Sequence, residues 1–314
     1  MPIHPWLAEK FKLIRDIPSF DAAFADPMYA ALVMEYLQDP QPWKPPEGVV
    51  AETRSVDAPH GAVTIKVFRP TASTGHAPAL LWMHGGGFVI GSIDDTESVI
   101  PGFELAARAR AVVVSVDYRL AVEGVQYPAA LDDVSAAWSW LTEHVDELGL
   151  DADRLFIGGA SVGGNLGVAA TVRLRDEAAP MPRGMILGYP LVHFPLPPLT
   201  PEFSAELGQL PPMLRFPPEY QAGILFNYAG RIDDLPSGVA PGNFDVSGLP
   251  EAWIVVSEYD DLRTSGELFA EQLIAAGSTA HFEIARGMVH GHLGRGPSLV
   301  PVDATLDFFA EALR

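Results

Sequence analysis

The stretch LFIGGASVGGNL, residues 155–166, places a serine between a short apolar run and a second run that begins with glycines. Residues 155–157 are predicted to form a buried strand, and residues 162–175 a helix. The G-x-S-x-G spacing around Ser161 is typical of a sharp strand-to-helix turn, because glycine permits the strained backbone of such a turn. We therefore expect the Ser161 hydroxyl to stand clear of the strand end, where it could act as a nucleophile.

Strands and helices alternate from about residue 50 to the C-terminus. The predicted strands are short alternating, β-branched or apolar runs, at residues 63–68, 80–83, 111–116, 155–157, 185–187, 253–257 and 281–284. The predicted helices lie at residues 128–147, 162–175, 264–276 and 302–312. This alternation predicts an α/β fold, with a mostly parallel central sheet and helices on both faces.

Two segments depart from the alternation. Residues 1–50 carry apolar side chains at helical spacing until a proline cluster at 40–46 ends the pattern. Residues 195–250 combine many prolines with large apolar side chains. A lid is favoured there over a long ordered loop, because structureless loops of that length are uncommon in compact domains. We predict a helical cap built from both segments, over a catalytic core of residues 51–194 and 251–314.

The run His84-Gly85-Gly86-Gly87 directly follows the strand predicted at 80–83. Bare glycine backbone can aim its N–H groups at a developing negative charge without obstruction by side chains. The alternative is a glycine-rich turn with no chemical role. Because the run occurs together with the G-x-S-x-G turn, we favour the prediction that it forms an oxyanion hole.

A serine hydroxyl needs a base to remove its proton and a carboxylate behind that base. In a strand-turn-helix arrangement of this kind, the acid and then the histidine follow the serine in the chain. Of the three histidines near the C-terminus, His281 falls within a predicted strand. His290, in the loop after that strand, is the favoured base, and His292 is its competitor.

The acid is expected in the loop after the strand at 253–257, where Asp260 and Asp261 are adjacent. Either carboxylate could orient the histidine. An aspartate at the start of the helix predicted at 264–276 could instead cap its free N–H groups. We expect one aspartate to orient the histidine and the other to cap the helix.

From about residue 50 to its end, the chain resembles the bacterial hormone-sensitive-lipase-like esterases of the α/β-hydrolase superfamily. Six segments in the family's order carry the resemblance: HGGGFVIGS at 84–92, VDYRLAVE at 116–123, YPAALDDV at 127–134, GGASVGGNL at 158–166, SEYDDLR at 257–263 and GMVHGHL at 287–293. The resemblance implies Ser161 as the nucleophile, His290 as the base and Asp260 as the acid.

The resemblance also assigns the supporting positions. It implies that the N–H groups of Gly86, Gly87 and Val162 form the oxyanion hole. Four further side chains in the quoted segments are implied to be structural: His84, Tyr118, Arg119 and Asp133.

The chain departs from the family pattern at several positions. The family usually has an acidic residue or threonine at 160, alanine at 162, proline at 122 and 261, and often an aromatic residue at 292. This chain has Ala160, Val162, Val122, Asp261 and His292 there. The branched side chain at 162 is expected to narrow the acyl side of a substrate pocket. Without proline at 261, Asp261 stays available as the alternative acid.

The composition excludes several classes of protein. The net charge of −20 gives no reason to approach a nucleic-acid backbone or an anionic membrane. With no cysteine, the chain can have neither a disulfide nor a thiolate metal site. We expect a soluble, cytoplasmic protein with neither signal peptide nor membrane insertion.

The chemistry expected from these residues is hydrolysis of short- to medium-chain neutral carboxylic esters through an acyl-enzyme, without metal or organic cofactor. Activity should fall in acid as the histidine protonates near its ordinary pKa of about 6.5. The alternatives are hydrolysis of a lactone, amide or complex acyl product, and a non-catalytic small-molecule receptor of the kind that resembles this family in plants. The partner expected is a small-molecule ester, and the resemblance leaves a homodimer open.

Large apolar side chains in the cap segments have two interpretations. They are expected either to line an apolar acyl or alcohol pocket or to form the core of the cap itself. In the second segment they are Phe203, Met213, Leu214, Phe216, Tyr220 and Phe226.

Overall fold

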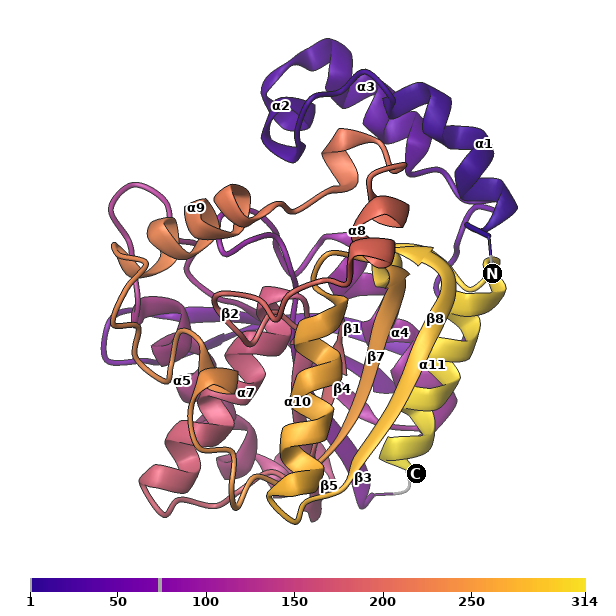
Figure 1. The fold of residues 1–314 in the computed structure, drawn as a ribbon. Coiled ribbons are helices and arrows are strands. Elements are labelled where there is room, and N and C mark those ends of the chain that lie inside the picture. The colour runs from indigo at the N-terminus through magenta and orange to yellow at the C-terminus, as the bar shows by residue number, and fades with distance from the viewer. Residues whose placement is uncertain (1, 73–74) are drawn as a thin grey trace.

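The computed structural model describes residues 2–72 and 75–314. Eight strands in these residues form one sheet (Figure 1). In sheet order they are β1 (Val49–Val56), β2 (Val63–Pro70), β4 (Val112–Asp117), β3 (Ala77–Met83), β5 (Leu150–Ala160), β6 (Gly184–Gly188), β7 (Glu251–Tyr259) and β8 (Ala280–Val289). The pairs β1–β2 and β2–β4 are antiparallel and every later pair is parallel. The prediction of a mostly parallel sheet is confirmed.

Helices cover both faces of the sheet (Figure 1). One face carries α4 (Thr96–Ala109) and α11 (Val300–Leu313). The other face carries α5 (Ala129–Glu143), α7 (Val162–Asp176) and α10 (Arg263–Ala275), and the short α6 (Val145–Leu148) follows α5. Within residues 2–72 and 75–314, no helix is both long and apolar enough to cross a bilayer.

The central strand β3 is buried on both faces, as its apolar sequence predicts. Leu81 and Met83 pack into the core beneath α5 and α7. Leu80 and Trp82 pack on the opposite face, where the Trp82 ring lies 6.4 Å from the Phe309 ring of α11. Both apolar layers therefore hold β3 rigidly, and the glycine run that begins at Gly85 extends from its carboxyl end.

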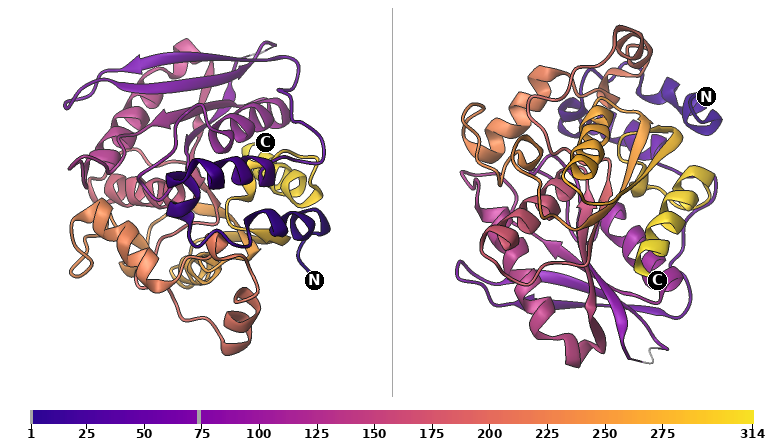
Figure 2. Two further views of the ribbon diagram at one scale, coloured as in Figure 1. Left: turned by 90° about the horizontal axis from the view of Figure 1, so that it is seen from above. Right: turned by 60° about the horizontal axis from the view of Figure 1, so that its bottom comes forward.

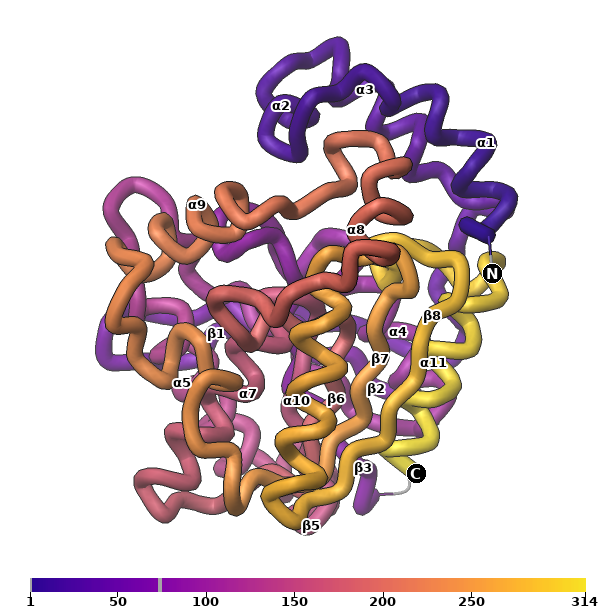
Figure 3. The backbone as a smooth tube through the Cα atoms, viewed as in Figure 1, coloured from indigo at the N-terminus to yellow at the C-terminus, as the bar shows by residue number. Residues whose placement is uncertain are grey.

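The N-terminal helices α1 (Pro5–Ile14), α2 (Phe20–Ala25) and α3 (Pro27–Tyr36) lie above the carboxyl ends of the parallel strands (Figures 1 and 2). In Figure 3 the chain from β6 to β7 rises beside them and returns to the core. This second segment contains α8 (Pro201–Leu207), η1 (Pro212–Leu214), α9 (Pro218–Ala229) and η2 (Pro241–Asn243). The Tyr220 hydroxyl of α9 donates to the Asp21 carboxylate of α2 at 3.0 Å, which joins the two segments.

Two elements were missed by the sequence analysis. Helix α4 contains Pro101 and Gly102, which normally argue against a helix. A Cβ at Gly102 would lie 2.6 Å from the Phe68 ring, so close packing on β2 requires the glycine. Strand β1 is a mostly exposed edge strand and lacks a continuous apolar run. Because β1 begins at Val49, the boundary predicted at residue 50 falls inside it.

Predicted element limits also needed correction. The helix predicted at 128–147 ends at Glu143, and α6 follows as a separate turn. Strand β5 begins at Leu150, five residues before the apolar run that predicted it. Its first part carries the segment DADR at 151–154, which has three charged residues and is partly or fully exposed, so hydrophobic pattern alone could not detect it.

Close contact between β3 and α7 leads to a stability prediction. A Cβ at Gly163 would lie 2.2 Å from the Met83 carbonyl oxygen, a backbone atom that cannot move aside. Gly163→Ala should therefore lower the free energy of unfolding by at least about 1–3 kcal/mol, as overpacked sites do. The matched control is Gly223→Ala in α9, where a Cβ meets nothing within 4 Å and alanine favours the helix. Urea unfolding of both variants checks this; equal stabilities would contradict the packing argument.

Candidate active site

Ser161 lies in the turn between β5 and α7, with backbone angles φ 54° and ψ −119°. Non-glycine residues rarely adopt this region, which costs on the order of 1–3 kcal/mol. The turn is held by the Ser161 N–H, which donates to the Gly188 carbonyl oxygen at 2.8 Å. A Cβ at Gly159 would lie 2.3 Å from the Met83 carbonyl oxygen, so the sharp turn needs the flanking glycine.

The Ser161 hydroxyl and the His290 ring are in contact, although 129 positions separate them in the chain. His290 Nε2 lies 3.0 Å from Ser161 Oγ, and His290 Nδ1 lies 2.7 Å from Asp260 Oδ2. With Asp260 ionised, its carboxylate accepts from Nδ1–H and leaves Nε2 free to accept the serine proton. The structure therefore brings together the three residues that the sequence selected for this role.

The two adjacent aspartates have different partners. The Asp260 side chain is fully buried, and its second oxygen accepts from the Leu262 N–H at 2.9 Å. The Asp261 carboxylate instead pairs with Arg215, in the segment of residues 195–250. Helix α10 has no side-chain cap, so the expectation that the second aspartate would cap it is wrong. The sequence analysis could not predict this, because the partner of Asp261 is Arg215, which lies 46 positions away in the chain.

His292, the competing base, is buried, and its ring meets the Tyr189 ring edge-on, as the His290 ring also does. Its Nδ1 lies 2.9 Å from Ser257 Oγ, and its Nε2 lies 3.2 Å from Thr305 Oγ1. Burial, with a smaller contribution from His290, lowers the pKa of His292 to about 3. Both ring nitrogens of His292 therefore have partners other than Ser161, which suits a structural role.

The electrostatic surroundings of His290 act in opposite directions. Burial disfavours the charged imidazolium, but the charge and hydrogen bond of Asp260, together with the charges of Glu97 and Asp261, outweigh burial. The net effect is a pKa of His290 above the ordinary 6.5, with the Glu97 carboxylate contributing in the same direction. The sequence-based expectation of an ordinary pKa is therefore revised upward.

The glycine run after β3 is fixed by several hydrogen bonds. Gly86 has φ 105°, and a Cβ there would lie 2.1 Å from the Ile90 carbonyl oxygen. The Gly86 carbonyl accepts from the N–H groups of Val89 and Ile90, both at 3.1 Å. A Cβ at Gly85 would lie 3.2 Å from Ser161 Cβ, which places the run directly beside the serine.

The loop also has side-chain supports. His84 Nδ1 lies 2.7 Å from the Gly85 carbonyl oxygen, and the Tyr118 hydroxyl donates to the His84 carbonyl at 2.9 Å. In a separate contact, the Asp133 carboxylate of α5 accepts from both the backbone N–H and the guanidinium of Arg119, which follows β4. These contacts fit the structural roles implied by the family resemblance.

Val162 is the first residue of α7, so its N–H lies at the positive end of the helix dipole, next to Ser161. Gly87, in the glycine run after β3, has a positive φ of 61°. The Val162 side chain is buried, in the same apolar cluster as Leu166 of α7.

A cavity of about 450 Å³ opens over the serine. The core contributes Ser161, His290, Gly85 and Gly86 to its walls. Both cap segments contribute large apolar side chains: Phe20, Phe24, Val33, Tyr36, Leu37, Met213, Leu214 and Phe216.

The pocket interpretation holds for three of the six apolar side chains named in residues 195–250, and the exposed Phe226 fits neither interpretation. Met213, Leu214 and Phe216 line the cavity. Phe203 lies under the Arg263 guanidinium at 5.0 Å, and Phe226 is 56% exposed. Tyr220 joins the two cap segments through its hydroxyl.

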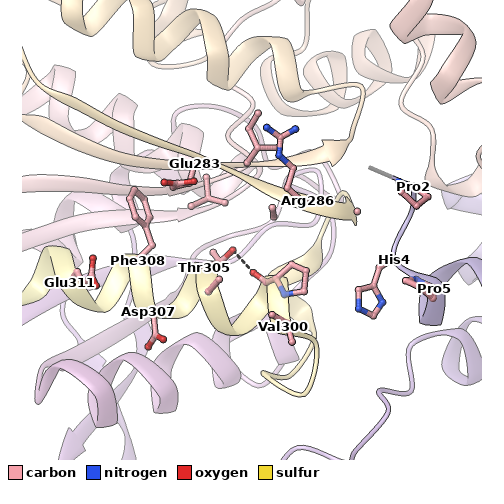
Figure 4. A pocket seen from close by; sticks show the side chains of 16 residues that line it. Pro2, His4, Pro5, Glu283, Arg286, Val300, Thr305, Asp307, Phe308 and Glu311 are labelled. Atoms are coloured by element: carbon pink, nitrogen blue, oxygen red, sulfur yellow. Dashed lines mark hydrogen bonds between the residues drawn. The ribbon is translucent and has the colours of Figure 1, made fainter.

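A larger cavity, of about 750 Å³, lies between β8, α11 and the N-terminal segment (Figure 4). Arg286, Phe308 and His4 are among its lining residues. None of the described residues in its wall is a member of the Ser161–His290–Asp260 set. The candidate site is therefore the smaller cavity.

Two residues of the candidate site were missed by the sequence analysis. The Glu97 carboxylate at the start of α4 accepts from the Gly85 N–H at 2.7 Å and from the Tyr189 hydroxyl. The Tyr189 ring meets the His290 ring edge-on, with centroids 4.8 Å apart. No motif marks either residue, since their roles depend on contacts between distant segments.

Over residues 2–72 and 75–314, no group of three or more His, Cys, Asp or Glu side chains is arranged to hold a metal ion. That catalysis needs no cofactor stays a prediction.

Comparison with known proteins identifies the family. Residues 80–294 match a family model described as the α/β-hydrolase fold. The chain is 36% identical to carboxylesterase NlhH of Mycobacterium tuberculosis, over 74% of this chain and 71% of that protein. It is 32% identical to an ethyl acetate hydrolase of Pseudomonas putida, over 75% and 72% of the two chains.

A solved structure of an esterase from Pyrobaculum calidifontis superposes with a TM-score of 0.78 at 27% identity, covering 100% of this chain and 98% of that one. The chain belongs to the α/β-hydrolase family, among the hormone-sensitive-lipase-like esterases that its motifs resemble.

Proposed function

We propose that this protein is a carboxylesterase in which Ser161, His290 and Asp260 form the catalytic triad. The observation that carries the proposal is the continuous contact from the Asp260 carboxylate through the His290 ring to the Ser161 hydroxyl, at 2.7 and 3.0 Å. The family relatives named carboxylesterase and ethyl acetate hydrolase support the same reaction.

In the proposed acylation step, Ser161 Oγ attacks the ester carbonyl carbon while His290 Nε2 takes the hydroxyl proton. The carbonyl oxygen becomes an oxyanion, and the N–H groups of Gly86, Gly87 and Val162 stabilise it. When the tetrahedral intermediate collapses, the carbon–oxygen bond to the alcohol breaks and His290 returns its proton to the departing oxygen. The acyl group remains on Ser161.

In deacylation, a water molecule attacks the acyl carbon and transfers a proton to His290 Nε2. The second tetrahedral intermediate releases the carboxylic acid, and the proton returns to Ser161 Oγ. Asp260 stays ionised throughout and holds Nδ1–H, so that Nε2 always faces the serine. The residues named here suffice for both steps without a metal or organic cofactor.

The size and lining of the cavity support the proposal that the substrates are neutral, apolar esters of short to medium chain length. Its walls are mostly apolar, and about 450 Å³ is at the small end of ligand-pocket sizes. The carboxylates of Asp95 and Glu97 also line it and would repel an anionic substrate. We propose that the helices of residues 1–50 and the segment 195–250 act together as the cap of this pocket.

The first prediction concerns the nucleophile. The wild-type protein should hydrolyse p-nitrophenyl acetate, butyrate and hexanoate, and Ser161→Ala should lower kcat by a factor of about 10⁴ or more, because no other group forms the acyl-enzyme. Circular dichroism of the variant checks that it is folded. An alanine variant with unchanged turnover would refute the assignment.

The same assays on γ-lactones and anilides separate the ester reaction from its alternatives. Faster turnover of a lactone or an amide than of every simple ester would replace the proposed substrate class. Binding of esters without any turnover would favour a receptor.

The acid can be tested by two matched substitutions. Asp260→Asn reverses the preferred tautomer of His290 and should lower kcat by about 10⁴-fold. Asp261→Asn should lower it by no more than about tenfold, since its carboxylate contacts Arg215 and not the histidine. Steady-state kinetics on p-nitrophenyl butyrate give the ranking, and the opposite order would make Asp261 the acid.

The pKa of His290 leads to a pH prediction. The base must be neutral, so activity is present above its pKa and is lost as the pH falls through that value. Because this pKa is raised in the free enzyme, the acid limb of kcat/KM should have its midpoint above 6.5. Glu97→Gln removes a negative charge that contributes to the raised value, so its midpoint should move to lower pH. An unmoved midpoint in this variant would show that the Glu97 charge does not act on His290.

A further inference from the structure

Asp261 is the feature that the triad leaves unexplained, since it lies next to the acid, is buried and does not touch the histidine. We propose that Asp261 and Arg215 form a clamp that holds Phe216 against the His290 ring and so sets which ester groups the cavity accepts. This inference rests on the proposed function and assigns two positioning residues and one specificity-determining residue to its site.

The clamp consists of three hydrogen bonds to one carboxylate. Arg215 Nε and one terminal nitrogen donate to the two Asp261 oxygens, both at 2.9 Å. The Phe216 N–H donates to Oδ2 at 2.7 Å. A guanidinium fork on a carboxylate fixes orientation as well as distance, and the backbone bond extends this to residue 216.

Burial gives the clamp its strength. The Asp261 side chain is only 4% exposed and that of Arg215 is 22% exposed. Removing one partner would leave a charge in a site with little water, which is costly, whereas an exposed pair would contribute little. The cap segment is therefore bound firmly at this point.

The clamp connects the cap to the triad loop. Asp261 directly follows Asp260, while Arg215 and Phe216 lie between η1 and α9 in the second cap segment. On its other side, the Phe216 carbonyl accepts from the Gln221 side chain at 2.5 Å. Residue 216 is thus fixed from the core and from α9, so its position depends on the loop that carries the acid.

Phe216 is where this positioning affects the substrate. Its ring meets the His290 ring edge-on, with centroids 4.8 Å apart, and it lines the cavity. The Phe20 ring of the N-terminal cap lies 6.2 Å away. Phe216 therefore forms the part of the cavity wall that lies between His290 and the N-terminal cap. Its release would widen the cavity beside the reacting carbonyl.

The experiment compares Asp261→Asn, Arg215→Met and Phe216→Ala with the wild type on p-nitrophenyl acetate and on a bulky ester, p-nitrophenyl decanoate. For all three variants, the ratio of kcat/KM for decanoate to that for acetate should rise about tenfold, or about 1.4 kcal/mol. The change should lie mainly in KM, because the triad itself is intact. In the double variant of Asp261 and Arg215, the rise should equal that of either single variant, as expected for one clamp.

The control variant is Asp133→Asn. Asp133 has a similar local arrangement, with the same 4% exposure of its side chain. It accepts an arginine fork and a backbone N–H, here that of the arginine itself, but it lies outside the cavity wall. It should lower Tm by an amount similar to Asp261→Asn without changing the ratio. An equal change in the ratio for Asp133→Asn would overturn the clamp and assign the effect to general loosening.

Other outcomes also decide the matter. A changed ratio in Phe216→Ala alone would leave Phe216 as a selecting residue and refute its positioning by Asp261 and Arg215. An unchanged ratio in all three variants would refute the whole inference. Labelling of Ser161 by a fluorophosphonate distinguishes these results from failure of the proposed function, because the label reacts with the clamp variants if only the clamp is wrong.

Discussion

The strained turn at Ser161 is the constraint on which the rest of the site depends. A left-handed backbone at a serine persists only where its surroundings hold it, and here β3 and α7 approach so closely that no side chain fits at Gly159 or Gly163. The turn aims the hydroxyl at the edge of the sheet and places the N-terminus of α7 beside it. The position of the Ser161 hydroxyl, the proposed nucleophile, and that of the N–H group at the start of α7 therefore depend on the same backbone geometry.

The parallel sheet supplies the other groups. The carboxyl ends of strands β3, β5, β7 and β8 lie on the same side of the sheet. Each is followed by a part of the candidate site: the glycine run, Ser161, Asp260 and His290, in that order. Residues more than a hundred positions apart thus meet without long supporting loops. Side chains from residues 1–50 and 195–250 give the cavity beside these groups a mostly apolar lining.

The sequence predicted the parts of this arrangement that depend on local pattern. The turn at Ser161, the glycine run and the positions of the buried strands along the chain follow from short motifs and hydrophobic runs, and His290 was selected by its place after a strand. Contacts between distant segments could not be predicted in this way. Asp261 pairs with Arg215 instead of capping α10, and Glu97 supports Gly85, because the tertiary fold happens to juxtapose them. The same limit explains α4, whose internal Gly102 is required by its close packing on Phe68 of β2.

The central claim is that the hydroxyl of Ser161 and the ring of His290 meet the carbon of one ester carbonyl group, while the N–H groups of Gly86, Gly87 and Val162 meet its oxygen. A crystal structure of the protein after reaction with a p-nitrophenyl alkylphosphonate, whose tetrahedral phosphorus imitates the intermediate, tests it most directly. The account predicts phosphorus bonded to Ser161 Oγ, with one phosphonyl oxygen within hydrogen-bond distance of those three N–H groups. Phosphorus bonded to another side chain, or a phosphonyl oxygen turned away from the glycine run, would contradict it.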